Sequence, residues 1–518
     1  MKMKLKQFKI LLISTLILHS SNIYSAEISD LVKAWKKQDY LILTIPVKFD
    51  QLEPTSSLNA HTKLSLPLVY EPLVSIGAQQ ELQPILAKSW RISADNKSVI
   101  ITLKQNHYFS NNTEVKAQDV VDTIYRACSP SSKVFEELKG LVGCEDYAKE
   151  KNIKPQISVI GSHQVKFKIN SSPTNFLYQL SSPSFVITKL TNAGLIGSGP
   201  YIVQERKPAY LVLNKSPFQK LMSAYNNGLV LFYANQDNLP RILNTDKPDG
   251  SIMYRMQDIW NIKNNNYKLV KVNPNITEIM VLNNQRFPFN HTIVRKALLS
   301  ALYNNFDHTC IPGAHKAYGI IPYGTGGSID NNSPNNLPTI TPAEVFTKVP
   351  SLKDKKASIT IHELEDLKNS CESEQIKRTA QLYNIDIKFK YHKNYSSLEP
   401  LYLNHQLDGF IELYVFRNRE AYSILQYFTK AGENNANIKN SIIDNMLKDA
   451  IAETASHGRF QSYRKIAEYM QNEGIVIPLF YMDHGNLLSK CLSGASENFL
   501  FNPFSHLPQL VKINGCVI

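Results

Sequence analysis

Apolar and polar positions form their clearest pattern between Leu66 and Cys128. Within this stretch, Val99–Lys104 is β-branched and apolar, which predicts a strand. Ala117–Ala127 places its apolar residues on one helical face, which predicts a helix. Turn-forming pairs separate these elements. The residues concerned are Asp95, Asn96, Asn111 and Asn112 in the turns, and Val120, Val121, Ile124 and Ala127 on the helical face.

Similar patterns recur to the end of the chain. Strands are predicted at 40–49, 211–214, 385–391, 407–416 and 475–481, and a hairpin at 157–169. Helices are predicted at 173–180, 293–302, 371–384, 441–455 and 460–472, with Gly474 as a C-cap of the last one. The stretch 331–350 is rich in Asn, Pro and Thr and is predicted to be a loop. Helices alternating with strands indicate an α/β protein.

Length and composition set the class of protein. A chain of 518 residues exceeds a single core and predicts two or three lobes. Its 43% hydrophobic and 19% charged residues are typical of a globular protein. The formal net charge is +13, but no dense basic block or nucleic-acid-binding motif occurs. The basicity is therefore interpreted as diffuse, and no nucleic acid is expected as a partner.

The N-terminus has the pattern of a cleaved signal peptide. Four lysines precede the apolar run Ile10–Leu18, and small residues follow at Ser25 and Ala26. Tyr24 is an imperfect residue for the cleavage site, so the cut could shift by one position. The run is too short to span a bilayer. We expect an exported protein in the periplasm, and no lipid anchor, because the first cysteine is Cys128.

Six cysteines are typical of an oxidising compartment. Six cysteines allow 15 pairings, so sequence alone does not fix one. Proximity favours Cys128–Cys144 and Cys491–Cys516, which leaves Cys310–Cys371. Metal binding is the weaker alternative, because no CxxC, HExxH or zinc-finger spacing occurs. His308, Cys310 and His315 are close in sequence and remain a minor metal candidate. No cofactor is predicted.

The opening stretch resembles the signature of the family 5 extracellular solute-binding proteins, the dipeptide, oligopeptide and nickel receptors of ABC importers. The matching residues are Tyr70, Glu71, Leu73, Pro84, Leu86, Ala87, Ser89, Trp90, Asp95, Leu103, Phe109, Ala117, Asp119 and Val120. The run Gly197–Tyr201 resembles the GTGPY turn of the family. A later stretch resembles its strand and helix, through Leu282, Asn283, Pro288, Phe289, Val294, Arg295, Ala297, Leu298 and Ala301.

The resemblance implies a two-lobed periplasmic binding protein of type II, with an extra α/β domain inserted in the first lobe. The expected segments are a signal peptide at 1–26, the first lobe at 27–65, 195–275 and 485–518, the extra domain at 66–194 and the second lobe at 276–484. It also implies that the loop after the first strand lines the ligand. The residues there are Leu58, Asn59 and Ala60.

The chain departs from the family near residue 417. In its peptide receptors, an aspartate in this segment binds the α-amine of the peptide. Counting from Asp408 places Tyr414 at the tryptophan position of the motif and Arg417 at the aspartate position, with Val415 between them. A guanidinium favours carboxylate or phosphate, so we hypothesise an anionic ligand. The open alternative is a local shift of register, with Glu412 or Glu420 binding an amine.

The sequence therefore predicts a monomeric receptor that binds a peptide or peptide-like solute and delivers it to an inner-membrane permease. Within the binding class, a nickel, haem or other non-peptide ligand stays open, as does an orphan sensor. A secreted hydrolase is the remote alternative, since no G-x-S-x-G, HExxH or S-x-x-K motif stands in a convincing context. No enzyme activity is expected.

Overall fold

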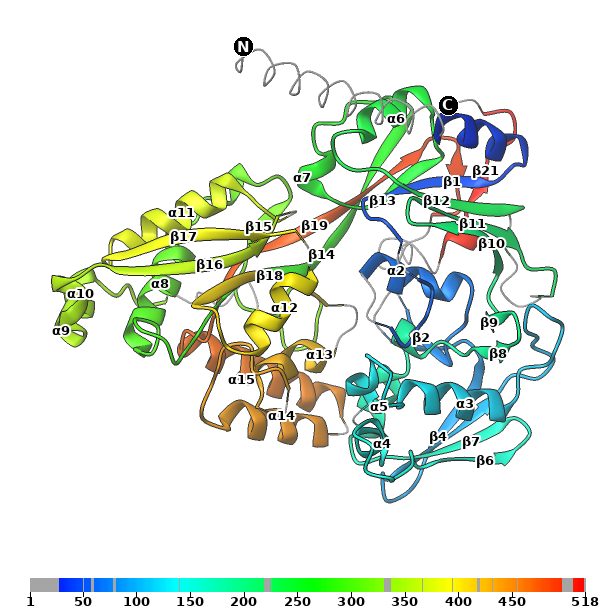
Figure 1. Cartoon of the computed structure of the whole chain (residues 1–518), viewed down its shortest axis with the longest axis horizontal. Helices are drawn as coiled ribbons and strands as arrows, with labels where there is room; N and C mark the ends of the chain where they lie inside the picture. The colour runs from blue at the N-terminus through cyan, green and yellow to red at the C-terminus, as the bar shows by residue number, and fades with distance from the viewer. Residues whose placement is uncertain are drawn as a thin grey trace, which may run out of the picture.

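The computed structural model describes most of the chain after its first 27 residues (Figure 1). The described ranges are 28–49, 51–56, 60–77, 81–138, 140–218, 224, 226–329, 337–365, 367–393, 395–416, 420–430, 432–453, 455–495 and 506–516. The predicted signal peptide at 1–26 lies outside them. Among the described helices, none combines the length and the apolar content that crossing a membrane requires.

One eleven-stranded sheet runs through both lobes. Its order is β10-β11-β12-β1-β13-β19-β14-β18-β16-β17, and β15 pairs with β19. The strands of the first lobe are β1 (Leu41–Ile45), β10 (Tyr201–Lys207), β11 (Tyr210–Lys215), β12 (Gly228–Tyr233) and β13 (Gly250–Arg255). Those of the second lobe are β15 (Ala314–Lys316), β16 (Ala357–Leu364), β17 (Ile385–His392) and β18 (Gly409–Val415).

Two long strands, β14 (Tyr267–Leu282) and β19 (Val476–Ser489), connect the lobes (Figure 1). They pair with each other along their length. At one end β19 pairs with β13 of the first lobe, and at the other end β14 pairs with β18 of the second lobe. The register shifts between Val272 and Ile276, where one lobe gives way to the other. This crossing, around Val272–Ile276, is here named the hinge.

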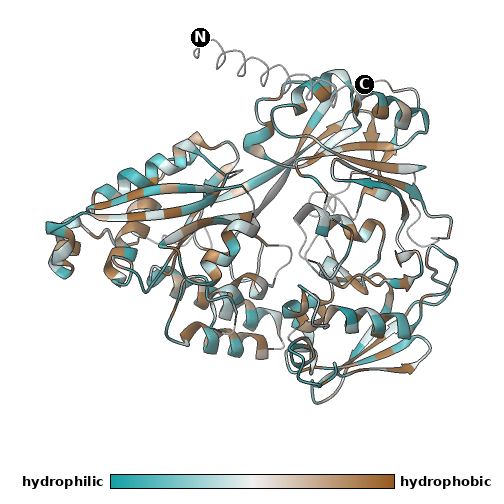
Figure 2. Cartoon of the chain, in the orientation of Figure 1, coloured by the Kyte–Doolittle hydropathy of each residue, from teal (hydrophilic) through white to brown (hydrophobic). Residues whose placement is uncertain are grey.

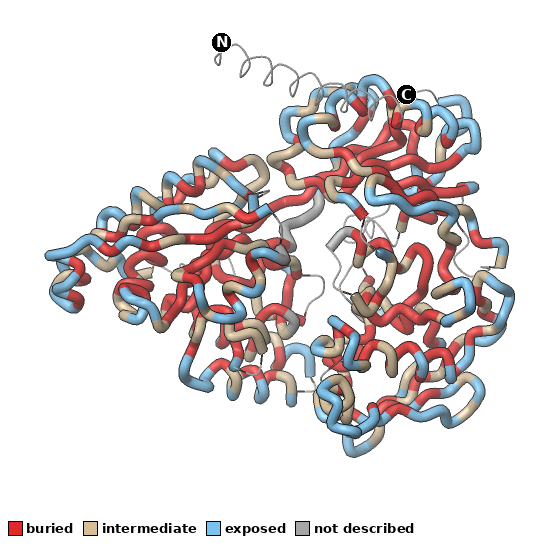
Figure 3. The backbone as a smooth tube through the Cα atoms, viewed as in Figure 1, coloured by how far each residue is buried: buried red, intermediate tan, exposed pale blue. Residues whose placement is uncertain are grey.

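Helices cover both faces of the sheet in the second lobe. On one face lie α8 (Thr292–Asn305), α9 (Pro342–Lys348), α10 (Pro350–Asp354) and α11 (Ser370–Gln381). On the other lie α12 (Tyr395–Leu403), α13 (Tyr422–Leu425), α14 (Ile442–Ala452) and α15 (Ser456–Asn472). Along β14, Met280 belongs to the first core and Ile279 to the second, because successive strand residues face opposite sides. Apolar residues and burial accordingly concentrate along the strands (Figures 2 and 3).

The first lobe carries a second, smaller sheet with its own core. The sheet has the order β4-β5-β7-β6, from β4 (Ala87–Ile92), β5 (Ser98–Leu103), β6 (Ile157–Gly161) and β7 (Gln164–Lys168). Around it lie α3 (Ala117–Ala127), α4 (Cys144–Ala148) and α5 (Pro173–Gln179). Short pairs complete the chain: β2 (Val74–Ile76) with β3 (Leu82–Pro84), β8 (Lys189–Thr191) with β9 (Gly194–Ile196), and β20 (Leu492–Ser493) with β21 (Val511–Lys512). The fold is thus α/β and two-lobed, as predicted; the domain boundaries stay a prediction.

Most predicted elements form where the pattern placed them, and one predicted loop is wrong. The loop predicted at 331–350 contains α9, which begins at Pro342 after an N-cap at Thr341. The Thr341 hydroxyl accepts a hydrogen bond from the Glu344 amide, and the Glu344 carboxylate accepts one from the Thr341 amide. The sequence contains this capping box, but the loop was predicted from the Asn- and Pro-rich composition of the stretch instead.

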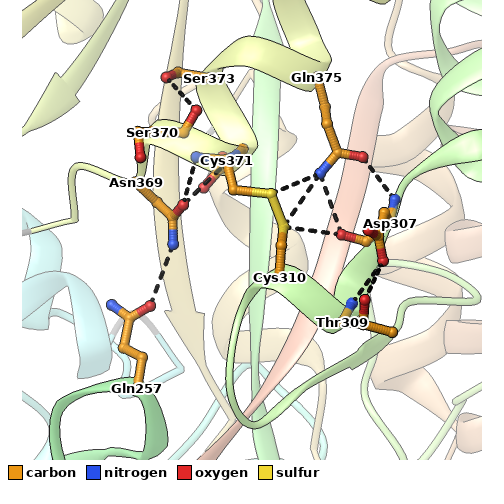
Figure 4. The surroundings of a disulfide bond; sticks show 10 residues. Gln257, Asp307, Thr309, Cys310, Asn369, Ser370, Cys371, Ser373 and Gln375 are labelled. Atoms are coloured by element: carbon orange, nitrogen blue, oxygen red, sulfur yellow. Dashed lines mark hydrogen bonds between the residues drawn. A yellow bond between two sulfur atoms is a disulfide. The ribbon is translucent and has the colours of Figure 1, made fainter.

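The structure has the two disulfides that proximity favoured and the third that they left over. They join Cys128 to Cys144, Cys310 to Cys371, and Cys491 to Cys516. The second bond ties the short 3-10 helix at His308–Cys310 to the start of α11 (Figure 4). Cys310 is therefore not a metal ligand, and the His308, Cys310 and His315 candidate is wrong. His315 instead pairs with Asp483, with Nε2 2.8 Å from Oδ2.

Candidate ligand-binding site

The carboxyl ends of two strands point toward the hinge from opposite lobes. In the first lobe, β1 runs parallel to β13, whose last residues pair with the hinge-side residues Gly485 and His484 of β19. In the second lobe, the last residue of β18, Val415, pairs with Ile276, at the hinge side of β14. Ligands of open α/β sheets bind beyond the carboxyl ends of strands. The segments that follow β1 and β18 are therefore the candidate ligand-binding segments.

The predicted site residues belong to these two segments, and only part of them is described. Leu58, Asn59 and Arg417 lie outside the described residues. Ala60 begins α2 (Ala60–Ser65), and its side chain is likewise outside them. Their contact with a ligand stays a prediction.

Tyr414 and Val415 are the last two residues of β18, with side chains on opposite faces of the sheet. Tyr414 is buried in the core under α13 and lies near the rings of Tyr427 and Phe428. Its hydroxyl accepts a hydrogen bond from the Asn435 side chain at 2.8 Å. Val415 is half-buried and packs against the apolar core on the opposite face. Tyr414 thus anchors the end of the strand, and a direct ligand contact by either residue stays a prediction.

Glu420, the first described residue after Arg417, lies in a buried ion pair. The guanidinium of Arg459 on α15 donates Nε–H to Glu420 Oε2 at 2.8 Å and Nη2–H to Oε1 at 2.5 Å. The Tyr463 hydroxyl donates to the same carboxylate at 2.8 Å. Burial and then the charge of Glu420 raise the pKa of Tyr463. Because Arg459 is fully buried and Glu420 nearly so, this network fixes the carboxyl end of the candidate segment. Sequence reasoning missed Arg459, which has no local motif.

A second buried network holds the signature residues of the first lobe. The carboxylate of Glu71 contacts His107 Nε2 and accepts a hydrogen bond from the Ser198 hydroxyl at 2.9 Å. Gly199 donates its amide to Val69 O at 2.9 Å. A Cβ on Gly199 would lie 2.6 Å from the Val69 carbonyl carbon, and one on Gly197 would lie 2.1 Å from Val69 O. The two glycines are therefore required for the close approach of these segments.

The lobes also approach each other away from the hinge strands. On one side, Asn369 at the start of α11 donates to Gln257 of α7 (Met256–Ile259) at 3.4 Å (Figure 4). Elsewhere, burial raises the pKa of Tyr422 on α13, and the charge of Glu136 from the first lobe raises it further. Side chains of the two lobes thus lie close enough to interact at these places.

Comparison with known proteins identifies the family. Residues 81–347 match the pattern of the bacterial extracellular solute-binding proteins, family 5 Middle. The chain belongs to this family. The prediction made from the signature residues is confirmed.

Among curated relatives of this family 5 protein, the periplasmic murein peptide-binding protein MppA of Escherichia coli K12 is 24% identical over 199 residues. The nickel-binding periplasmic protein of the same strain is 25% identical over 244 residues. These matches cover 35% and 45% of the chain and 37% and 45% of the relatives. The chain therefore matches less than half the length of each curated relative.

Solved structures extend the likeness of this family 5 protein to the whole fold. The E. coli murein tripeptide binding protein MppA superposes with a TM-score of 0.77 at 16% identity, covering 92% of this chain and 99% of that one. The binding protein AgaA, solved with agropinic acid from A. tumefaciens R10, gives 0.75 at 15% identity with the same coverage. This fold is thus shared by a protein named for a murein tripeptide and by one solved with agropinic acid.

Proposed function

We propose that this protein is the periplasmic substrate-binding receptor of an ABC importer. It captures a peptide or peptide-like solute between its lobes and delivers it, as a monomer, to an inner-membrane permease. The observation that carries the proposal is the hinge: β14 and β19 join two lobes, and the carboxyl ends of β1 and β18 point toward it from opposite sides. Membership of the family supports the same role, as does the name of MppA.

The mechanism is closure of two lobes around a ligand. A ligand that contacts both candidate segments has more contacts in the closed form than in the open form, and this difference in binding free energy shifts the population toward closure. The networks around Glu420 and Glu71 keep each lobe rigid while this occurs. The permease then needs to distinguish only the closed form from the open form.

The proposal is tested by calorimetry and thermal unfolding with mixtures of di- to pentapeptides and with murein tripeptide. We expect saturable binding and a rise in melting temperature. Native mass spectrometry of protein purified from its own periplasm identifies a retained ligand. Mass analysis of the peptides after incubation is the second readout. Cleavage of the peptides without formation of a complex would contradict the receptor proposal. It would instead support the alternative that the protein is a secreted hydrolase.

A second candidate is a receptor for an anionic solute. In the family-based register, Arg417 occupies the place of the amine-binding aspartate, while the nearby acid Glu420 is held by Arg459 and Tyr463. An ammonium about 4 Å from a guanidinium is repelled by roughly 4 kcal/mol at an effective dielectric of 20. AgaA shows that this fold accommodates agropinic acid.

The two candidates differ in their response to one variant. For an anionic ligand, Arg417→Ala weakens binding at least about tenfold, since a charge-assisted hydrogen bond is lost. Arg419→Ala is the matched control from the same segment. The opposite result is that ordinary peptides bind, that Glu412→Ala abolishes their binding and that Arg417→Ala does not. The hypothesis of an anionic ligand is then wrong.

A further inference from the structure

Three glutamates converge beneath the start of α11, in the second lobe. Glu278 comes from β14, Glu363 from β16 and Glu372 from α11. Each is at most 3% exposed. One carboxylate oxygen from each lies within 4.8 Å of the other two. The rest of this sheet face is apolar, with Ile276, Met280, Ile359 and Ile361 beside them on the same two strands.

Glu372 does not have the usual role of a glutamate at its helix position. Asn369 caps α11, and its side-chain oxygen accepts hydrogen bonds from the amides of Cys371 and Glu372. A glutamate at the third position commonly turns back to the cap, as Glu344 does toward Thr341 in α9. Glu372 points into the core instead. Among the described residues, no donor outside the cluster reaches either of its carboxylate oxygens or Oε1 of Glu278, and the two acids are in hydrogen-bonding contact only with each other.

Within the described ranges, no side-chain cation forms an ion pair with Glu278 or Glu372. Arg255 is the basic residue whose charge reaches Glu278, but its guanidinium pairs with Asp258, with Nε 3.0 Å from Oδ2. Burial raises the pKa of Glu278 to about 7, although the contact with Glu372 and the charge of Arg255 lower it. Burial and the charge of Glu278 raise the pKa of Glu372. Buried acids in this arrangement require protons or a cation.

We propose that Glu278, Glu363 and Glu372 bind one hard divalent cation of the size of Ca²⁺. Carboxylate oxygens are the ligands that such ions prefer. Calcium–oxygen distances of about 2.3–2.6 Å allow two ligands to lie up to about 5 Å apart across the ion, whereas the roughly 2.1 Å of Mg²⁺ allows about 4.2 Å. Oxygens within 4.8 Å of one another can therefore all reach an ion of the larger size. The ion supplies the buried carboxylate of Glu372 with a counter-charge.

Through its three ligands, the ion would link the start of α11 to the strands β14 and β16. The same turn of α11 carries Cys371, bonded to Cys310, and follows Asn369, which contacts Gln257 of the other lobe (Figure 4). The cation would therefore brace the second lobe where it meets the first near the hinge. This proposal is independent of the transported ligand and of the receptor role.

The test uses the full chain, stripped of metal by chelator and dialysed at pH 7.5. Calorimetry and elemental analysis give affinity and stoichiometry for CaCl₂, MnCl₂ and MgCl₂. We expect one Ca²⁺ per chain, weaker binding of Mg²⁺, and a saturable rise in melting temperature. Glu372→Gln weakens Ca²⁺ binding by at least about tenfold. Glu344→Gln, the exposed glutamate at the same position of α9, leaves binding unchanged.

Two results would overturn the proposal. One is that no cation binds, while Glu372→Gln is at least as stable as the natural chain, because the cluster is then held together by protons. The other is that Glu344→Gln and Glu372→Gln lose binding equally, because the ion then lies elsewhere. If Glu372→Gln does not fold, Tb³⁺ luminescence of the natural chain replaces it. Tb³⁺ that Ca²⁺ fails to displace, or that does not bind, also overturns the proposal.

Discussion

At the scale of single residues, close contacts give the signature motifs their physical meaning. In the sequence, the Gly197–Tyr201 turn is identified only by its similarity to the family motif. The structure supplies the reason, since Gly197 and Gly199 lie against the backbone of Val69. The sequence could not reveal that neighbour, because Val69 is far from the turn along the chain.

Gly199→Ala tests this contact. We expect a loss of about 1–3 kcal/mol in the free energy of unfolding, because the new methyl group would lie 2.6 Å from a backbone carbon that cannot move freely. Urea unfolding followed by circular dichroism measures the loss. Gly161→Ala is the matched control, since its Cβ has no neighbour closer than 3.7 Å. Equal stability of the two variants would contradict the packing argument.

The buried ion pair of Glu420 and Arg459 gives a second prediction. Arg459→Met should cost about 3–5 kcal/mol of unfolding free energy, because it leaves the Glu420 carboxylate buried without its counter-charge. Adding Glu420→Gln should recover a substantial part of this loss. Arg464→Met removes the half-exposed pair with Glu468 and should cost under about 1 kcal/mol. A double variant as unstable as the single one would show that packing, not charge, dominates.

His362 and His392 give the chain an acid-sensitive pair. Their rings stack, with Nδ1 of His362 2.8 Å from Nε2 of His392. Burial, followed by the charges of His392 and Lys390, lowers the pKa of His362 to about 4. The unfolded chain therefore binds this proton more readily than the folded chain between about pH 6.5 and pH 4.

At pH 7 the free energy of unfolding should therefore carry no penalty from His362. It should fall as the pH drops from about 6.5 toward 4, by up to about 3 kcal/mol from this residue. Urea titrations at several pH values measure this slope. His362→Gln should flatten it. His457→Gln, which alters an exposed histidine of α15, should not. An unchanged slope in His362→Gln would assign the acid sensitivity to other groups.

At the scale of elements, patterns within one segment predicted most helices and strands. Periodicity and capping are local, so α3 and the β6–β7 hairpin formed as expected. The failure at α9 was local too, because composition outweighed a capping box that the sequence contained. The length of β19 was underestimated, since it continues through the hinge to Ser489.

The disulfide between α3 and α4 fixes two elements of the smaller core. Replacing Cys128 and Cys144 together by Ser should cost about 2–4 kcal/mol of unfolding free energy, because the unfolded chain gains freedom. Both cysteines are fully buried, so the loss of packing adds to the effect. Urea unfolding under non-oxidising conditions compares this variant with the Cys491→Ser and Cys516→Ser double variant. A loss below about 1 kcal/mol would contradict the expectation.

At the scale of the whole molecule, the strands β14 and β19 belong to both lobes, so a movement of one lobe relative to the other involves these strands. Closure has to bend β14 and β19 near the register shift between Val272 and Ile276. We expect the radius of gyration from small-angle X-ray scattering to fall when a transported ligand saturates the protein. Ca²⁺ alone should leave it unchanged, since the proposed ion lies within one lobe. An unchanged radius with bound ligand would contradict closure.

By itself, the sequence determined the family, the α/β class and the order of elements, and proximity indicated the disulfides Cys128–Cys144 and Cys491–Cys516. These depend on periodicity, motif order and short separations, which are readable along the chain. Only the tertiary structure decided which distant side chains meet. The sheet order places Glu278 and Glu363 on either side of β18, and the packing of α11 on this face places Glu372 beside them. Likewise, Arg459 reaches Glu420 because α15 packs on the sheet face below the candidate segment. The physical reason is that burial and charge pairing depend on how elements stack.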